Sequence, residues 1–311
     1  MSIQQRALQL HSILYNSKTR ETDLVQFITS LTRDERLQVR EKYNETFVSD
    51  EDLLNVLKKK LGGDFQDIVL KLFLTRAELG CQQIIRSLGL LTKNETAIYE
   101  IIFSSPKWLR DKIKTEYQLK QNKDMESDIV SAFSGKIKKV LPIFINGERR
   151  VNRNPNHSEC EKLAYDLIAA KVENWIENEH IINDIFAGLS PHELVLTCRY
   201  FYKKTGNTVL DEVEKLPKNE KKFFNHLLFN VCNPAEMFAK KINESIKGLG
   251  TDTNLLERII VSRYDIDMFL IKKYYQQLYK ISAREDIEDD TSGAYKELVR
   301  ALLWIQTKTD Y

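Results

Sequence analysis

Two glycines placed two positions apart are the feature of this 311-residue sequence that most resembles a binding site. Gly248 and Gly250 lie in the segment IKGLGTD, residues 246–252, between a helical apolar pattern and a Thr-Asp pair that can cap another helix. Such a turn can hold a ligand with its main chain, because glycine has no side chain to keep other groups away. A helix that ends on glycine before a capped second helix explains the same residues by turn geometry alone. Both interpretations stay open at this point.

The sequence offers little for catalysis. It has neither an H-E-x-x-H segment nor a phosphate-binding P-loop. The four cysteines are widely spaced without a C-x-x-C pair, which argues against zinc and disulfides and fits reduced thiols in a cytosolic protein. The five histidines are scattered along the sequence: His11, His157, His180, His192 and His226. We therefore expect that the protein is not an enzyme.

The composition is typical of a folded, highly charged protein, with 42% apolar and 30% charged residues. The 47 basic and 45 acidic side chains leave a formal net charge of +2, which predicts no nucleic-acid partner. The N-terminus lacks a signal-peptide pattern, and apolar runs such as VLPIFI are too short to cross a bilayer. We expect any membrane contact to be peripheral and made from the cytoplasmic side.

Four similar segments indicate an internal repeat. They are FITSL (27–31), IIFSS (101–105), IFAGL (185–189) and IIVSR (259–263), at offsets of 74, 84 and 74 residues. An aromatic residue stands thirteen positions beyond the fourth residue of each segment: Tyr43, Tyr117, Phe201 and Tyr275. The chain therefore contains four copies of a unit of roughly 70 residues.

Each repeat has a helical apolar period, and turn signals divide it into about five helices. No convincing alternating strand occurs, so the predicted fold class is all-α. The stretch INGERRVNRNPN, rich in Asn and Arg, reads as an exposed linker that joins two halves of the chain. The predicted boundaries are repeat 1 at 4–75, repeat 2 at 76–146, a linker at 147–156, repeat 3 at 157–233 and repeat 4 at 234–308.

The four helical repeats, the longer central connector and the segments KGLGTD and IIVSRYDIDM of repeat 4 resemble the annexins. The resemblance extends from about residue 4 to 306, but only repeat 4 matches the glycine-rich motif of the family closely. It implies a curved all-α disc whose convex face carries calcium sites and docks on acidic phospholipid. The drift of the other repeats suggests a divergent member, similar to the protist giardins.

The resemblance also implies a calcium ligand set in repeat 4. Three main-chain carbonyls would come from Ile246, Gly248 and Gly250, and a bidentate carboxylate from Asp290 in EDDTSG. This oxygen set suits Ca²⁺, the expected cofactor. Isoleucine replaces the usual methionine at position 246, which should be tolerated because a carbonyl does the binding. The alternative for Asp290 is a simple helix cap.

The corresponding loops of the other repeats depart from this pattern. Lys60 in repeat 1, Ala132 in repeat 2, and Pro217 with Lys218 in repeat 3 stand where the acid belongs, and the paired glycines are missing. We therefore expect three of the four principal sites to be lost. A non-principal site on the acidic loop 173–179 of repeat 3 is an alternative to a plain charged surface loop.

In repeats 1 and 3 a lysine stands at the position of the lost acid or beside it. Lys60, Lys218 and Lys247 are candidates for direct contact with lipid phosphate, and basic runs occur near residues 58–60, 136–139 and 149–153. Solvated helix faces balanced by nearby acids explain these runs equally well. Trp175 stands where the family can carry a membrane-seeking tryptophan, and the alternative is that it packs against its own repeat.

The sequence thus predicts calcium-dependent peripheral binding to acidic phospholipid membranes through repeat 4, with a link to the cytoskeleton. The alternative is a structural, cytoskeleton-associated protein whose basic patches bind membranes or proteins largely without calcium. Either function places the protein in the cytoplasm, at the periphery of the plasma membrane or on the cytoskeleton.

Overall fold

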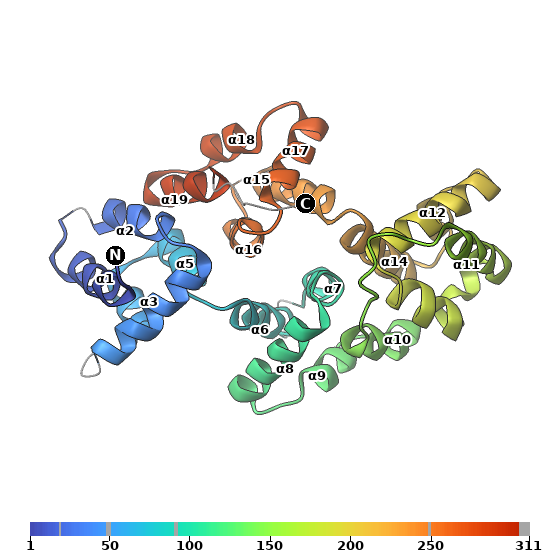
Figure 1. Cartoon of the computed structure of the whole chain (residues 1–311), viewed down its shortest axis with the longest axis horizontal. Coiled ribbons are helices and arrows are strands. Elements are labelled where there is room, and N and C mark those ends of the chain that lie inside the picture. The colour runs from blue at the N-terminus through green and yellow to red at the C-terminus, as the bar shows by residue number, and fades with distance from the viewer. Residues whose placement is uncertain (19, 48–50, 90–92, 248–249, 305–311) are drawn as a thin grey trace. The chain divides into compact units, whose positions relative to one another are not determined.

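The computed structural model describes most of the chain, and all its regular elements are helical (Figure 1). No strand occurs in the described part, which confirms the predicted all-α fold. No described helix is long and apolar enough to cross a membrane. The described residues are 1–18, 20–47, 51–89, 93–247 and 250–304.

The helices fall into four successive sets that follow the repeats. Repeat 1 has α1 (Ile3–Asn16), α2 (Arg20–Thr29), α3 (Arg33–Thr46), α4 (Leu53–Lys60) and α5 (Gly63–Leu72). Repeat 2 has α6 (Arg76–Ser87), α7 (Glu95–Ser104), α8 (Lys107–Gln121), α9 (Met125–Ser131) and α10 (Gly135–Asn146). Repeat 3 has α11 (His157–Ala170), η1 (Val172–Glu177), η2 (Ile181–Ala187), α12 (Pro191–Thr205), α13 (Val209–Val213) and α14 (Lys218–Cys232). Repeat 4 has α15 (Pro234–Ile246), α16 (Thr253–Arg263), α17 (Met268–Tyr279), α18 (Ala283–Asp290) and α19 (Gly293–Trp304).

Side chains encoded next to the helices define where several of them begin. Thr32 caps α3 and Ser190 caps α12, and in each case a glutamate three residues later returns a hydrogen bond to the cap. This reciprocal arrangement satisfies N–H groups that a helix cannot pair internally. The same element of repeats 1 and 3 therefore starts by the same local chemistry.

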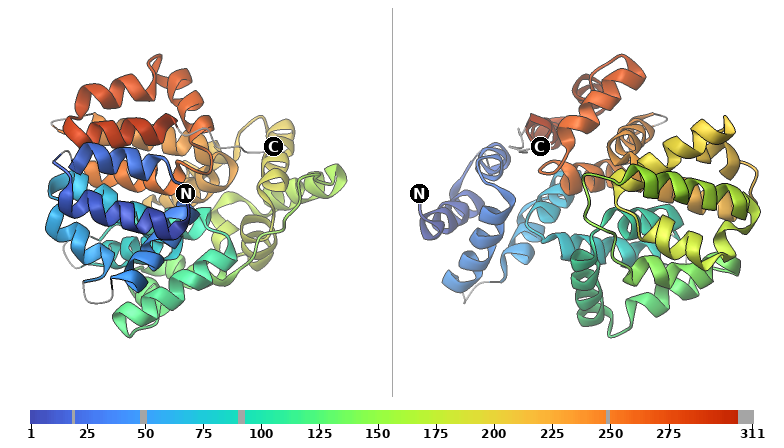
Figure 2. Two further views of the ribbon diagram at one scale, coloured as in Figure 1. Left: turned by 60° about the vertical axis from the view of Figure 1, so that its left-hand side comes forward. Right: turned by 45° about the vertical axis from the view of Figure 1, so that its right-hand side comes forward.

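The chain divides into two compact units, each built from two repeats. Unit 1 consists of Met1–Leu79 and Ala235–Tyr311, and unit 2 consists of Gly80–Pro234. Repeat 1 is thus paired with repeat 4, and repeat 2 with repeat 3. Figures 1 and 2 show the first helices of the chain, in blue, beside the red α19, in agreement with the packing of α19 on α2 and α5.

The stretch at 147–156 connects repeats 2 and 3 and runs within unit 2. The guanidinium of Arg149 donates to the carbonyls of Phe186 at 2.5 Å and Leu189 at 3.1 Å. The main-chain N–H of Arg150 donates to the carbonyl of Gly188 at 2.8 Å. These bonds connect the stretch to η2 and to the turn between η2 and α12.

A buried polar network connects the two repeats of unit 1. Arg36 is fully buried and donates to the carbonyls of Ile28, Leu31 and Leu72 and to the hydroxyl of Tyr264. Arg33 pairs with Asp265 at 2.8 Å. A guanidinium tolerates burial only when its N–H groups find partners, and these partners come from both repeats.

Aromatic rings fill the centre of unit 2. The ring of Phe223 on α14 meets the rings of Tyr99, Phe103 and Phe144 edge to face, with centroids 5.4–5.7 Å apart. Edge-to-face pairs at this spacing are favourable beyond the area that they bury. The contact joins α7 and α10 of repeat 2 to α14 of repeat 3.

Candidate functional site

The IKGLGTD segment connects α15, which ends at Ile246, to α16, which begins at Thr253. Gly250 has a φ of 91°, a conformation that glycine adopts without strain. The N–H of Asp252 donates to the carbonyl of Ser245 at 2.7 Å, which closes the turn. The carbonyl of Ile246 is one of the last in α15, and no described residue donates a hydrogen bond to it. Gly248 lies outside the described residues.

Asp290 is the last residue of α18, and its side chain is exposed. The hydroxyl of Thr251 donates to the carbonyl of Asp290 at 3.1 Å and to its carboxylate. The turn after α15 therefore touches the end of α18, although the two are far apart in sequence. These are the two segments that the resemblance to annexins pairs in one calcium site.

The charges around this contact are mostly acidic. Asp289 and Asp290 are exposed, and Asp286 lies one helical turn earlier, where its carboxylate accepts from the hydroxyl of Tyr275. Burial, and then this hydrogen bond, raises the pKa of Tyr275 above its usual range. The ammonium of Lys247 lies 3.7 Å from the carboxylate of Asp286. Lys247 is thus placed at the turn, with its charge directed at an acid.

The oxygen atoms at this contact suit a hard cation, although most would have to come from the main chain. Among the described residues, no group of three or more His, Cys, Asp or Glu side chains could hold a metal ion. The exposed carboxylate of Asp290, the carbonyl of Ile246 and the main chain of the glycine turn are the donors that a calcium ion could use. Nothing in this set would favour zinc or another soft metal.

Repeat 1 holds a cation at the equivalent position. Lys60 ends α4, and its ammonium lies 4.2 Å from the centroid of the Tyr15 ring. The guanidinium of Arg20 donates to the carbonyl of Lys60 at 3.2 Å. The carbonyl is thus already in use, and the acid is replaced by an ammonium held over an aromatic face.

In repeat 2 the equivalent position is Ala132, the residue that follows α9. The described residues of the loop between α6 and α7 contain no acid. Glu95, the first residue of α7, is paired with Lys93 at 3.1 Å and with Lys222 at 3.0 Å. Residues 90–92, within SLGLLTK, lie outside the described part of the chain.

Trp175 of repeat 3 is buried. It packs within its own repeat, as one of the two alternatives for this residue proposed, and it is not exposed as a membrane-contacting tryptophan would be. Its side chain is 1% exposed, and its indole N–H donates to the carbonyl of Leu167 at 2.9 Å. Its ring lies against the rings of Phe186, Phe201 and Phe224. A satisfied indole among aromatic rings has no surface left for lipid.

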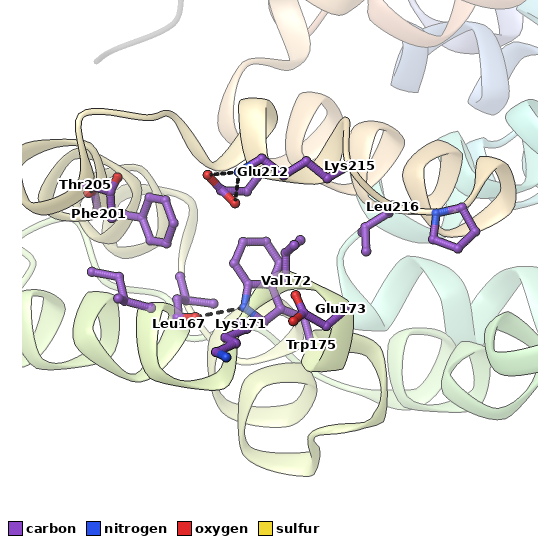
Figure 3. Close-up of a pocket in the computed structure, with 12 residues that line it drawn as sticks. Leu167, Lys171, Val172, Glu173, Trp175, Phe201, Thr205, Glu212, Lys215 and Leu216 are labelled. Atoms are coloured by element: carbon purple, nitrogen blue, oxygen red, sulfur yellow. Dashed lines mark hydrogen bonds and ion pairs between the residues drawn. The ribbon is translucent and has the colours of Figure 1, made fainter.

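A pocket of about 410 Å³ opens over this tryptophan (Figure 3). Leu167, Phe201 and Leu216 contribute to its apolar lining, and an ion pair at 2.6 Å between Glu212 and Lys215 lies at one side. The pocket separates the loop after α11 from the loop before α14. These are the two segments that would have to meet around calcium in this repeat.

Lys218 begins α14, is exposed and has no ion-pair partner among the described residues. In the acidic loop of repeat 3, Glu177 is paired with Lys136 of repeat 2 at 3.0 Å. The same ammonium lies 3.8 Å from Glu220. A cation from the protein itself therefore balances part of the loop that could have formed a non-principal calcium site.

Arg149 does not belong to a surface basic patch. Its guanidinium is enclosed by main-chain carbonyls, and burial lowers its pKa to about 10. Arg150, in contrast, is exposed and pairs with Glu159 at 2.7 Å. Only part of the basic run at 149–153 can therefore face a ligand.

Sequence reasoning missed a buried acid in unit 1. Glu257 on α16 is 1% exposed and is paired with Lys71 on α5. Its pKa is raised to about 7, mainly by burial. The signal available in the sequence was an acid inside the apolar run LLERII.

Comparisons with known proteins agree with the repeat structure. The annexin family model matches residues 5–72, 81–142 and 237–302. Annexin A13 of Homo sapiens is 27% identical over 298 residues, which cover 96% of this chain and 94% of that protein. The matched ranges fall in repeats 1, 2 and 4, and repeat 3 is the one with the irregular helices η1 and η2.

Solved structures share the fold. Annexin III superposes with a TM-score of 0.89 at 23% identity, covering 97% of this chain and 94% of that chain. Calcium-bound alpha-14 giardin superposes with a TM-score of 0.73 at 20% identity, covering 97% and 98%. Annexins in general bind phospholipid with the help of calcium and are not enzymes. The family match over most of the sequence, together with four helical repeats in two compact units, places this chain in the annexin family.

Proposed function

We propose that this annexin binds acidic phospholipid membranes peripherally through one calcium ion held in repeat 4. The ligands would be the carbonyls of Ile246, Gly248 and Gly250 and the carboxylate of Asp290. The observation that carries the proposal is the hydrogen bond from Thr251 to Asp290, because it brings the glycine turn to the acid. In repeats 1–3 a lysine, an alanine or a proline-lysine pair stands where this acid would be.

The proposed ligand set leaves room for lipid. Three carbonyls and one bidentate carboxylate supply about five of the six to eight oxygens that calcium takes. Water can complete the shell in solution, and lipid phosphate can do so at a membrane. With one carboxylate in the set we expect a dissociation constant on the order of 10⁻⁴ M or weaker in the absence of lipid. Calcium and membrane should then strengthen each other's binding.

Sedimentation with vesicles of phosphatidylserine and phosphatidylcholine tests the site. Asp290→Asn keeps the size of the side chain but removes the charge that would bind calcium. We expect the calcium concentration needed for half-maximal sedimentation to rise more than about tenfold. The matched control is Asp289→Asn, which removes the same charge from the neighbouring exposed residue and should behave like the wild type.

Two results would count against the proposal. If Asp290→Asn sediments like the wild type at every calcium concentration, the site is assigned to the wrong residue. If the wild type sediments equally well in a chelator, calcium does not control membrane binding.

The latter result would favour the second candidate function, direct contact of lysines with phosphate. The exposed Lys218 supports it, because its ammonium is not engaged by an acid of the described part. Lys60→Gln and Lys218→Gln should then reduce sedimentation in chelator. A link to the cytoskeleton, with a cytoplasmic location at the plasma membrane, belongs to the proposal as well, and co-sedimentation with actin or tubulin tests it.

A further inference from the structure

Three arginines of unit 1 gather around one carboxylate. Arg33 and Arg76 both pair with Asp265, at 2.8 Å and 3.0 Å. The guanidinium carbons of Arg33 and Arg36 lie 4.9 Å and 5.3 Å from the centroid of the ring of Tyr264. All five residues belong to the two ranges that form unit 1. We call the three guanidiniums and the carboxylate of Asp265 the arginine cluster.

The arginine cluster holds more positive than negative charge. Of the described acids, including the exposed Asp34, only Asp265 forms an ion pair with any of the three arginines. Three other acids, each one or two residues from the cluster in sequence, pair with other arginines: Glu35–Arg6, Glu78–Arg40 and Asp267–Arg263. Three guanidiniums and one carboxylate therefore leave a net charge of +2.

The charges of the arginine cluster are not fully compensated by the protein. Arg33 is buried, and its Nη1 has no hydrogen-bond partner among the described residues. Buried donors in proteins are rarely left in this state. Burial, and next the charge of Arg33, lower the pKa of Arg76, although Asp265 opposes them. A further anion at this place would therefore be stabilised.

Solvent reaches the arginine cluster on the side of Arg76 and Asp265. Their side chains are 27% and 21% exposed, whereas that of Arg33 is 6% exposed. Arg33 and Arg76 are the first residues of α3 and α6, and the N-terminal end of a helix favours an anion. Arg36 is fully buried and donates to carbonyls and to Tyr264, so it contributes charge but no free donor.

We propose that the arginine cluster binds a phosphate monoester, with Arg76 and Arg33 donating to its oxygens. A phosphate monoester carries nearly two negative charges at neutral pH, which matches the net charge of the cluster. Guanidinium groups suit phosphate because their N–H groups can donate to two oxygens at once. The same chemistry occurs in a soluble phosphate monoester and in the headgroup of phosphatidic acid. This inference goes beyond calcium-dependent membrane binding and does not depend on the calcium site.

Calorimetry on the full-length chain tests the binding. Inorganic phosphate is titrated into the protein near neutral pH in a chelator, and chloride keeps the ionic strength constant. We expect saturable binding by the wild type. Arg76→Gln should weaken it at least about tenfold, and this variant should fold because Arg76 is partly exposed. Absence of saturable binding by the wild type, or an unchanged affinity of Arg76→Gln, would overturn the proposal.

Asp265→Asn distinguishes a binding site from a cluster with only a structural role. The change removes the carboxylate that competes with phosphate for Arg33 and Arg76, so phosphate should bind at least about threefold more tightly. A structural role alone predicts no such gain. If the folded Asp265→Asn variant binds phosphate no better than the wild type, the charge of the cluster does not attract the anion. If this variant does not fold, the comparison of the wild type with Arg76→Gln still decides.

Three control variants exclude other sites. Arg150→Gln removes a guanidinium that is already paired with Glu159 at 2.7 Å, so it should bind phosphate like the wild type. Asp290→Asn should do the same, which separates this proposal from the one on calcium. Lys218→Gln tests an exposed lysine of repeat 3. A loss in Lys218→Gln as large as that in Arg76→Gln would overturn the assignment to the arginine cluster.

A second ligand tests the preference for a monoester. Dimethyl phosphate carries a single negative charge and should bind at least about threefold more weakly than inorganic phosphate. Equal affinities for the two would overturn the match between the double charge of the ligand and that of the cluster.

Vesicles distinguish the two sources of the phosphate. Vesicles of phosphatidylcholine with phosphatidic acid present the monoester on a membrane, and the chelator removes calcium. If the headgroup reaches the arginine cluster, Arg76→Gln should sediment less than the wild type, whereas Arg150→Gln should not. Equal sedimentation of the wild type and Arg76→Gln, together with phosphate binding in calorimetry, assigns the cluster to a soluble monoester. If Arg76→Gln behaves like the wild type in both experiments, the proposal is wrong.

Discussion

Glu257 brings an acid into the interior of unit 1. Its carboxylate pairs with Lys71, but the pair lies in an environment that disfavours charge. Burial raises the pKa of Glu257 to about 7, and Asp67 and Asp64 act in the same direction, although Lys71 opposes them. This carboxyl therefore titrates near neutral pH, whereas an exposed glutamate is already ionised there.

The stability of unit 1 should fall as the pH rises from about 4.5 to about 7. In the unfolded chain Glu257 loses its proton near 4.5, but in the folded chain it keeps the proton until about 7. Between these values the folded state binds more protons, so raising the pH favours unfolding, by at most about 3 kcal/mol. Glu257→Gln should remove this part of the pH dependence, which urea unfolding at a series of pH values measures.

Glu41→Gln is the matched control, because Glu41 is exposed on α3 of the same unit. It should leave the pH profile of unfolding unchanged. A Glu257→Gln profile that still falls over this pH range as the wild-type profile does would show that another group is responsible.

At the scale of elements, local signals predicted more than long-range ones. The apolar period of three and four residues predicted the all-α fold, and the turn residues predicted about five helices in each repeat, because both signals act between near neighbours in the chain. The surroundings of Trp175 and Arg149 could not be predicted in this way. Trp175 packs against the rings of Phe201 and Phe224, and Arg149 donates to the carbonyl of Phe186, and all three partners lie far away in the sequence.

The candidate site also combines features that local sequence signals predict with features that depend on long-range contacts. The glycine turn and the acid of EDDTSG were visible in the sequence, and the resemblance to annexins paired them. The contact from Thr251 to Asp290 needed the structure, because it depends on how α15 and α18 are placed within unit 1.

The helix caps give a prediction at this scale. Thr32 and Ser190 make the same capping box, but Thr32 is exposed, whereas Ser190 is 1% exposed and also donates to the carbonyl of Asn152 at 2.9 Å. Thr32→Ala should cost about 1 kcal/mol of stability. Ser190→Ala should cost about 2–3 kcal/mol, since it also leaves a carbonyl without its donor. Urea unfolding of both variants makes the comparison, and equal losses would show that the bond to Asn152 contributes nothing.

At the scale of the whole molecule, the chain pairs its first repeat with its last. Unit 1 is therefore assembled from two pieces of chain, and unit 2 from one continuous piece. The buried guanidinium of Arg36 shows what this means for folding, because its partners include Tyr264 of repeat 4. Repeat 1 by itself would leave this donor and the paired Arg33 without their repeat 4 partners.

Fragments of the chain should reflect this difference. Residues 80–234 expressed alone should fold cooperatively, because they contain both repeats of unit 2 and the ring cluster around Phe223. Residues 1–79 alone should not, since burying Arg33 and Arg36 without Asp265 and Tyr264 leaves charges unpaired, at a cost of about 3–5 kcal/mol. Circular dichroism during thermal unfolding distinguishes a cooperative transition from a gradual one. Adding residues 235–304 should restore a cooperative transition to 1–79. A cooperative transition of 1–79 alone would show that repeat 1 does not depend on repeat 4.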